Sequence, residues 1–175
     1  VMYVRRAEIM DQKHLVTVWK LGNNINTDLL YPSKYLYESQ EPAVLASHVL
    51  EPIYPDFQHM ITPGDFVVAG ENFGCGSSRE QAVTALKYAG CGGIIAKSYS
   101  RIFFRNCIAH GISAIVCPEA VDAVEEGDKI CVDGENGKIY VGDQVYTFSG
   151  FGDYVGAILK SGGLIPFLRK RMENC

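Results

Sequence analysis

Residues 70–80, with the sequence GENFGCGSSRE, combine glycines, two adjacent serines and an arginine in one short stretch. Gly74 and Gly76 permit positive φ and let the main chain approach a ligand closely. The stretch joins an apolar run to a predicted helix, whose first N–H groups and positive dipole end attract anions. Arg79 adds a guanidinium group that matches a carboxylate. These residues indicate a site for a small anion.

The same residues also fit a glycine turn that binds nothing. Ser77 with Glu80, and Ser78 with Gln81, match the capping box, in which a serine hydroxyl accepts a bond from a helix N–H group. A serine used in this way needs no ligand. The residue pattern alone leaves both interpretations open.

Other glycine motifs do not fit this stretch. A P-loop needs a lysine followed by serine or threonine, and neither follows the glycines here. The dinucleotide fingerprint needs a third glycine where Arg79 stands, and an acidic residue about 20 positions on, where residues 93–98 read GIIAKS. A nucleophile elbow would need glycine in place of Glu80.

Composition excludes several classes of protein. The chain has 175 residues, 47% of them hydrophobic, and a net charge of −4, which gives no basic field for nucleic acid. Its apolar runs are too short to span a membrane. Residues 1–13 form a polar N-terminal extension without a secretory signal, and residues 14–175 are expected to form a single domain in the cytoplasm.

The six cysteines, at positions 75, 91, 107, 117, 131 and 175, show no C-x-x-C pair, and no two histidines have metal-ligand spacing. We therefore expect buried thiols in a reducing compartment, and no metal site built by this chain. His48, His59 and His110 are isolated in sequence and indicate no function.

The central part of the chain alternates strands and helices. Apolar runs at 66–70, 92–98 and 112–117 predict buried strands, and amphipathic stretches at 78–90 and 100–111 predict the helices between them. This order implies parallel strands joined by right-handed crossovers. Ligands of such sheets bind at the carboxyl ends of the strands, where residues 71–79 are expected.

The flanking segments complete an α/β fold. A strand at 14–22, turns at 23–28, a tyrosine-rich loop, a short helix at 42–52 and a connector precede the first buried strand. Three short strands within 128–148 predict a small antiparallel ribbon. A helix at 152–164 and a basic tail at 165–175 end the chain.

Three segments resemble motifs of the swivel-domain subunits of the aconitase superfamily, in the same order: NTDLLYPSKYL, GENFGCGSSRE and AKSYSRIFFRN. The nearest pattern is that of the small subunits of 3-isopropylmalate dehydratases, or isopropylmalate isomerases, with homoaconitases and related alkylmalate dehydratases beside them. The resemblance covers residues 16–163. It implies a three-layer swivelling β/α domain with a mostly parallel sheet.

The resemblance implies a heterodimeric hydro-lyase that isomerises a 2-hydroxy dicarboxylic or tricarboxylic acid by dehydration and rehydration, as in leucine biosynthesis. A large subunit would carry a [4Fe–4S] cluster, and this chain would hold no cofactor. The expected partners are that subunit and a small hydroxy acid. A module that binds an anion without chemistry remains the alternative from a different class.

By the same resemblance, Ser77 corresponds to the catalytic base, and Ser78 and Arg79 to ligands of a substrate carboxylate. The alkoxide form of a serine needs N–H groups, a helix N-terminus and positive charge close by. Asp28 corresponds to a residue that orients the arginine or the closing loop, whereas Thr27 is expected to be a turn residue. Gly74, Cys75 and Gly76 would supply loop backbone.

Lys34, Tyr35 and Leu36 correspond to the loop that contacts the variable group of the substrate, although Lys34 fits a solvated lysine nearly as well. Tyr37 and Glu38 replace the arginine–threonine pair of isopropylmalate enzymes, and Gln81 replaces a common histidine. These departures leave the substrate open. Arg101 and Arg105 share one helix face that is either solvated or in contact with a partner.

Overall fold

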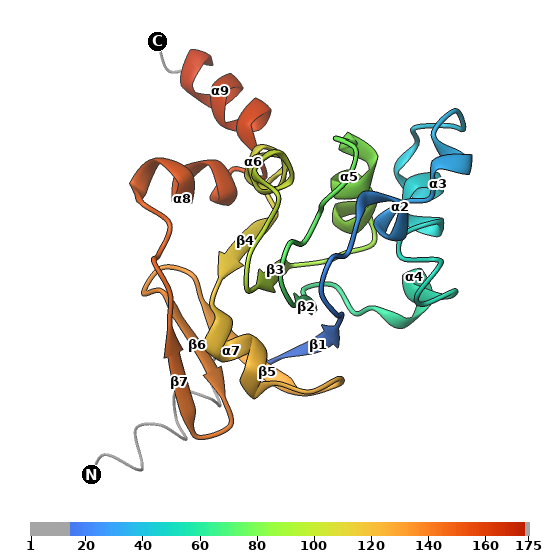
Figure 1. The fold of residues 1–175 in the computed structure, drawn as a ribbon. Helices are drawn as coiled ribbons and strands as arrows, with labels where there is room; N and C mark the ends of the chain where they lie inside the picture. The colour runs from blue at the N-terminus through green and yellow to red at the C-terminus, as the bar shows by residue number, and fades with distance from the viewer. Residues whose placement is uncertain (1–14, 174–175) are drawn as a thin grey trace.

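The computed structural model describes residues 15–173. In this range seven strands form one sheet, in the order β4-β3-β2-β1-β5-β6-β7 (Figure 1). The parallel strands are β1 (Val16–Lys20), β2 (Phe66–Ala69), β3 (Gly93–Ala96) and β4 (Ser113–Val116). The predicted α/β fold with parallel central strands is confirmed.

Both faces of the two central parallel strands, β2 and β3, are buried, which explains their unbroken apolar sequences. On one face Val67 and Ile94 join a large core beneath the helices α5 (Glu80–Tyr88) and α6 (Arg101–His110). On the other face Val68 and Ile95 join a second core with α7 (Pro118–Ala123). The result is the three-layer arrangement that the resemblance implied.

The antiparallel ribbon is also confirmed, and it continues the main sheet. Its strands are β5 (Lys129–Asp133), β6 (Lys138–Val141) and β7 (Gln144–Thr147). β5 pairs antiparallel with β1, where Val16 lies opposite Ile130. Ile130 and Ile139 are fully buried in the second core, so the ribbon helps to cover the sheet.

The long crossover from β1 to β2 contains four short helical segments on the same side of the sheet as α5 (Figure 1). They are α2 (Thr27–Leu30), η1 (Ser33–Tyr35), α3 (Pro42–Ser47) and α4 (Phe57–Met60). The predicted helix at 42–52 is therefore too long, because Leu50 has φ of +54°. The predicted connector before β2 contains α4, which is anchored by the buried Phe57.

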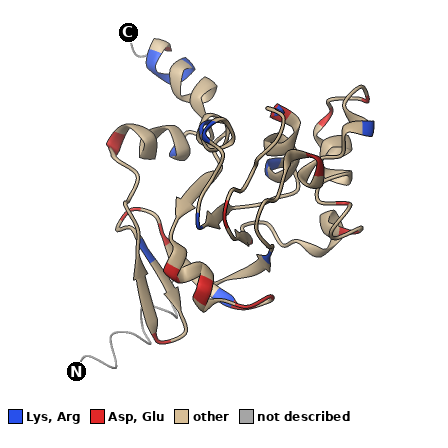
Figure 2. Ribbon diagram, viewed as in Figure 1, with Lys and Arg blue, Asp and Glu red and all other residues tan. Residues whose placement is uncertain are grey.

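At the C-terminal end, α8 (Asp153–Lys160) confirms the predicted helix, but the prediction of a basic tail is wrong. Leu164–Glu173 form a helix, α9. Pro166 is compatible with it because a proline in the first turn removes no intrahelical hydrogen bond. The basic residues of the predicted tail, Arg169, Lys170 and Arg171, lie on the later turns of α9 (Figure 2).

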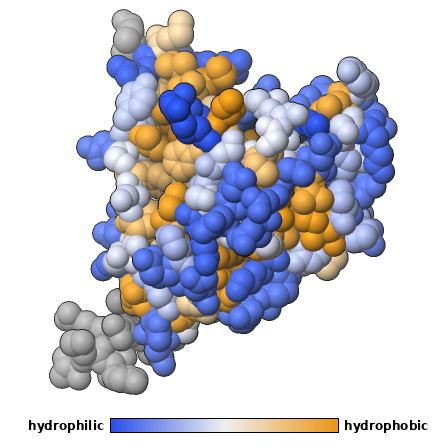
Figure 3. All heavy atoms as spheres, in the orientation of Figure 1, coloured by the Kyte–Doolittle hydropathy of each residue, from blue (hydrophilic) through white to orange (hydrophobic). Residues whose placement is uncertain are grey.

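Apolar residues gather over α8 and α9, at the upper left of Figure 3. Tyr154, Ile165, Leu168 and Met172 are exposed there. The predicted N-terminal extension, residues 1–13, lies outside the described residues. No helix within residues 15–173 combines the length and apolar character needed to cross a membrane.

Candidate active site

The three motif segments, far apart in sequence, meet at the carboxyl ends of β2 and β3. Asn26 forms a parallel bridge with Cys75, and Phe73 forms one with Tyr99. The N–H of Thr27 donates to the Cys75 carbonyl at 3.0 Å, and the N–H of Ser100 donates to the Phe73 carbonyl at 2.9 Å. The loop of residues 71–79 is therefore held from both sides.

Gly74 cannot be replaced without moving this loop. Its φ is +74°, and a Cβ at this position would lie 2.1 Å from Cγ of Phe103. Phe103 in turn packs edge-on against the fully buried Phe73, with ring centroids 5.4 Å apart. A glycine here lets the first turn of α6 press directly against the loop backbone.

Ser77 and Ser78 lie exposed between this anchored backbone and the start of α5. Neither hydroxyl forms a hydrogen bond with another described residue, and α5 begins after Arg79 without a side-chain cap. The capping-box interpretation is therefore wrong. The main-chain N–H groups of residues 76–79 likewise donate to no described residue, so several donors remain available at the positive end of α5.

Thr27 has a larger part than the predicted turn residue. It is 2% exposed, and its hydroxyl donates to the carbonyl oxygen of Ser77 at 2.9 Å. Asn26 caps α2 by accepting from the N–H of Leu29 at 3.0 Å. The first motif thus fixes the main chain of Ser77 and leaves its hydroxyl exposed.

Asp28 and Arg79 form a two-pronged ion pair. Nη1 of Arg79 lies 2.6 Å from Oδ1 of Asp28, and Nη2 lies 3.0 Å from Oδ2. The Arg79 bond lowers the pKa of the Asp28 carboxyl to about 2, against a smaller opposing effect of burial, and the Ser33 N–H bond at 3.0 Å also lowers it. Arg79 further donates to the Tyr31 carbonyl at 3.4 Å. The guanidinium group is held in one orientation beside the serines.

The pocket at this junction holds only about 20 Å³, roughly the room of one water molecule. Its lining comes from all three motifs: Thr27, Gly74, Gly76, Ser77, Ser78, Arg79, Ser100, Ile102, Phe103 and Asn106. A hydroxy acid cannot be enclosed by these residues alone. Sequence analysis missed Ser100, Ile102 and Asn106, although they belong to the third motif, and noted only the arginines between them.

Lys34, Tyr35 and Leu36 do not line this pocket. Lys34 pairs with Glu51 at 2.9 Å, and the Tyr35 hydroxyl donates to the same carboxylate at 3.0 Å. Leu36 packs against the larger core. The η1 segment that carries Lys34 and Tyr35 is linked to the pocket through the bond from Ser33 to Asp28.

In residues 15–173 no three His, Cys, Asp or Glu side chains come together in a way that could hold a metal ion. Cys91, Cys107, Cys117 and Cys131 are buried, and Cys75 is half-buried in the loop. Burial raises the pKa of the Cys91 thiol to about 11 and that of Cys107 further. Both side chains therefore stay protonated thiols.

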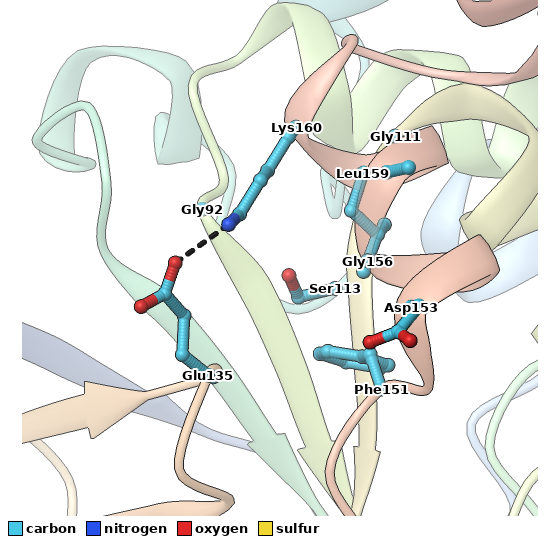
Figure 4. A pocket seen from close by; sticks show the side chains of 11 residues that line it. Gly92, Gly111, Ser113, Glu135, Phe151, Asp153, Gly156, Leu159 and Lys160 are labelled. Carbon is cyan, nitrogen blue, oxygen red and sulfur yellow. Dashed lines mark hydrogen bonds and ion pairs between the residues drawn. The ribbon is translucent and has the colours of Figure 1, made fainter.

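A larger crevice, of about 770 Å³, lies at the opposite end of the parallel strands (Figure 4). Gly92 and Ser113 contribute from the starts of β3 and β4, and α8 forms the facing wall. Lys160 of α8 and Glu135 of the ribbon point toward one another across it, 2.6 Å apart. Both side chains are about 70% exposed (70% and 72%).

Comparison with known proteins agrees with this geometry. Residues 8–120 match the family described as the aconitase C-terminal domain. The chain is 47% identical over 158 residues to the 3-isopropylmalate dehydratase small subunit 1 of Archaeoglobus fulgidus, covering 89% of this chain and 97% of the relative. It is 43% identical to the isopropylmalate/citramalate isomerase small subunit of Methanocaldococcus jannaschii, covering 90% and 94%.

A solved structure shows the same fold. The crystal structure of a 3-isopropylmalate dehydratase from Methanocaldococcus jannaschii superposes with a TM-score of 0.83 and 38% sequence identity, covering 90% of this chain and 94% of that one. The family match spans most of the chain, and the relatives exceed 40% identity over nearly their full length. The chain belongs to the aconitase C-terminal domain family.

Proposed function

We propose that this chain is the small subunit of a 3-isopropylmalate dehydratase, a hydro-lyase that isomerises its substrate by removing water and adding it back. The observation that carries this proposal is the convergence of three motifs on one pocket, where a serine whose hydroxyl has no partner within residues 15–173 lies beside a fixed arginine. The names and high identity of the relatives support it.

In the proposed reaction Ser77 is the base. Its oxygen takes the proton from the carbon next to a carboxylate, and returns a proton when water adds back at the other position. An ordinary serine is too weak an acid for this role at neutral pH, so its alkoxide must be stabilised. The free N–H groups of residues 76–79, the start of α5 and Arg79 supply that stabilisation.

Arg79 and Ser78 bind a substrate carboxylate in this proposal. Arginine has five N–H donors, and Asp28 engages one on each terminal nitrogen. The second donor of Nη1 reaches the Tyr31 carbonyl, so the second donor of Nη2 and the Nε donor remain for a substrate carboxylate. Because Asp28 is ionised down to about pH 2, it orients the guanidinium group throughout the physiological range.

The described residues of this chain do not fit an iron–sulfur cluster, since the thiols of Cys91 and Cys107 stay protonated and no group of ligands comes together. We assign the cluster to a large partner subunit, where it would supply Lewis-acid chemistry to the substrate hydroxyl. The very small pocket supports this division, because a second chain must close it around the substrate. The complex would work in the cytoplasm.

The test is co-purification with a large dehydratase subunit and an assay of the mixture. With 3-isopropylmalate, the complex should form a conjugated alkene intermediate that absorbs ultraviolet light, and each chain alone should be inactive. A substrate panel should include citramalate and homocitrate. Higher kcat/KM with homocitrate would contradict the substrate assignment. Tight anion binding by this chain alone in calorimetry, with no activity in the complex, would favour the binding module.

A further inference from the structure

His48, which follows α3, lies between two carboxylates. Its Nε2 is 3.3 Å from Oε2 of Glu38, and its Nδ1 is 3.2 Å from Oε2 of Glu51. The ring also stacks on Tyr35, with centroids 3.6 Å apart and planes 14° apart. Its side chain is 21% exposed. A histidine that is isolated in sequence therefore joins the loop of residues 33–40 to the end of α3.

The two contacts of the ring differ in kind. Nδ1 forms a hydrogen bond with Oε2 of Glu51, whereas Nε2 lies within ion-pair distance of Glu38 and forms no hydrogen bond with it. The ring thus links the two carboxylates through one directed bond and one contact between charges.

The surrounding charges reinforce Glu51 and leave Glu38 to His48. Bonds from Lys34, from the Tyr35 hydroxyl and from His48 lower the pKa of the Glu51 carboxyl, so it stays ionised. Glu38 forms no ion pair with any described residue except His48. Removal of the ring therefore removes the Glu38 contact and leaves the bonds from Lys34 and Tyr35 to Glu51 in place.

No other charged group competes at this ring among the described residues. Tyr31 lies edge-on at 6.3 Å and is uncharged at neutral pH because burial raises its pKa. On α5, which packs against α3, Glu80 pairs with His110, and Lys87 bonds to the carbonyls of His110 and Gly162. Asp56 and His59 of α4 form no ion pair with residues 15–173.

The loop that His48 holds begins at the candidate active site. The Ser33 N–H donates to Asp28, and Arg79 donates to the Tyr31 carbonyl. The Tyr31 hydroxyl donates to the Tyr35 carbonyl at 3.4 Å. Residues 33–40 are thus fixed at one end by the Asp28–Arg79 pair and at the other by His48, which contacts Glu38, and by Gln81, which donates to Gln40 at 3.2 Å.

We propose that His48 is a positioning residue for substrate specificity, because its ion pair with Glu38 and its stacking on Tyr35 hold residues 36–39 in the segment that begins at the Asp28–Arg79 pair. The part that concerns specificity rests on the proposed function. The part that concerns the loop rests on the contacts of His48 alone. Loss of these two contacts releases residues 36–39 and loosens discrimination between substrates.

The first test measures the loop without any assay. Amide hydrogen exchange of this chain should show about fivefold lower protection of residues 36–39 in His48→Gln, with a smaller change at residues 33–35, where Lys34 and Tyr35 keep their bonds to Glu51 although the ring stack is lost. Glu38→Gln should give the same loss, and the double variant no further loss, because both changes remove one bridge. His59→Gln, on the exposed end of α4, is the matched control. Unchanged protection in His48→Gln, or additive losses in the double variant, would overturn the bridge.

The second test uses the complex with the large subunit. His48→Gln should reduce the ratio of kcat/KM for 3-isopropylmalate over citramalate about fivefold, mainly through KM, while His59→Gln leaves the ratio unchanged. If protection falls but the ratio does not, His48 holds a loop that does not select the substrate, and the specificity role is overturned. A complex inactive on every acid, with the loop result intact, would contradict the proposed function and not the bridge.

Discussion

Polar side chains at the two ends of the parallel strands differ in their burial and hydrogen bonding. At the carboxyl ends, Ser77 and Ser78 are exposed, and their hydroxyls have no partner in the described part of the chain. At the amino ends, Asp65 is only 3% exposed, and its carboxylate accepts from the N–H of Thr17 at 2.7 Å, the N–H of Thr62 at 2.9 Å and the indole of Trp19 at 3.2 Å.

The difference separates groups that stabilise the fold from groups that are free to bind. A buried carboxylate with every oxygen bonded ties together the segments around it, and its removal leaves unpaired donors. An exposed hydroxyl at a helix start stabilises little and remains available. Pocket volume does not identify the candidate active site, because the crevice at the amino ends of the strands is far larger than the pocket at the serines.

If Ser77 is free to bind and does not stabilise the fold, Ser77→Ala should leave stability unchanged. A loss of stability would contradict the contrast between the two ends of the strands. We expect a loss of about 10³- to 10⁴-fold in kcat, because the proposed base is gone, with the melting temperature unchanged. Enzyme assays of the complex and thermal denaturation of the chain check this. Ser149→Ala, at another exposed serine, is the control. Near-normal turnover in Ser77→Ala would defeat the base assignment.

Changes to the ion pair beside the serines should have a smaller effect. Arg79→Lys keeps the charge but loses the fork, so we expect KM to rise about 10- to 100-fold.

Asp28→Asn frees the guanidinium group and should raise KM about tenfold. Because the pKa of Asp28 is about 2, below its ordinary value of 3.8, the pair persists above about pH 4 and is lost as the pH falls through about 2.

It follows that Asp28 does not set the acid limb of the pH–rate profile at ordinary assay pH. The profile of Asp28→Asn should therefore fall at the same pH as that of the unaltered enzyme, at lower rates. Kinetics between about pH 5 and about pH 9 measure this. An acid limb that moves in the variant would show that Asp28 titrates there.

Asp65→Asn should lower stability by about 2 to 3 kcal/mol, because an amide cannot accept all three hydrogen bonds. Burial raises the pKa of this carboxyl, but the bonds from Thr17, Thr62 and Trp19 outweigh that effect and lower it. The carboxylate therefore stabilises the fold above its ordinary pKa, and this contribution is lost as the pH falls through the lowered value.

Denaturant unfolding at neutral and acid pH measures the effect of Asp65→Asn. The difference between variant and parent should shrink in acid, and Asp143→Asn, in the exposed turn before β7, should change nothing. Activity of the folded complex should be preserved in both. If Asp65→Asn were as stable as the parent at neutral pH, Asp65 would not stabilise the fold, and the difference between the two ends of the strands would be contradicted.

The crevice in Figure 4 gives the smallest expected effect. Lys160→Gln removes its exposed pair with Glu135, and such pairs contribute little. We expect kcat/KM of the complex to change by less than about twofold, with no measurable change in melting temperature. A large loss of activity would mean that the amino ends of the strands also take part in function.

The sequence predicted the buried strands and the helices between them because short apolar runs such as FVVA and GIIA are typical of buried strands. The location of the serine loop followed from the order of strand and helix. The short helices α4 and α7 were missed because one or two turns leave no clear period, and α9 was missed because Pro166 and the basic residues at 169–171 interrupt its apolar pattern.

Contacts between residues that are distant in the chain could not be predicted from the sequence. Asp28 and Arg79 are 51 positions apart, and their ion pair depends on how the crossover folds back over α5. The same folding places Thr27 under Ser77 and His48 between Glu38 and Glu51. The single signal in the sequence for Asn106 and Ser100 was their membership of a motif whose arginines had drawn attention.

The small volume at Ser77 has a practical consequence for inhibitor design. A compound screened against this chain in isolation meets a cradle with room for little more than a water molecule, so weak hits or none are expected. Screening should use the paired enzyme, and a compound that fills the seam between the chains would gain affinity from both.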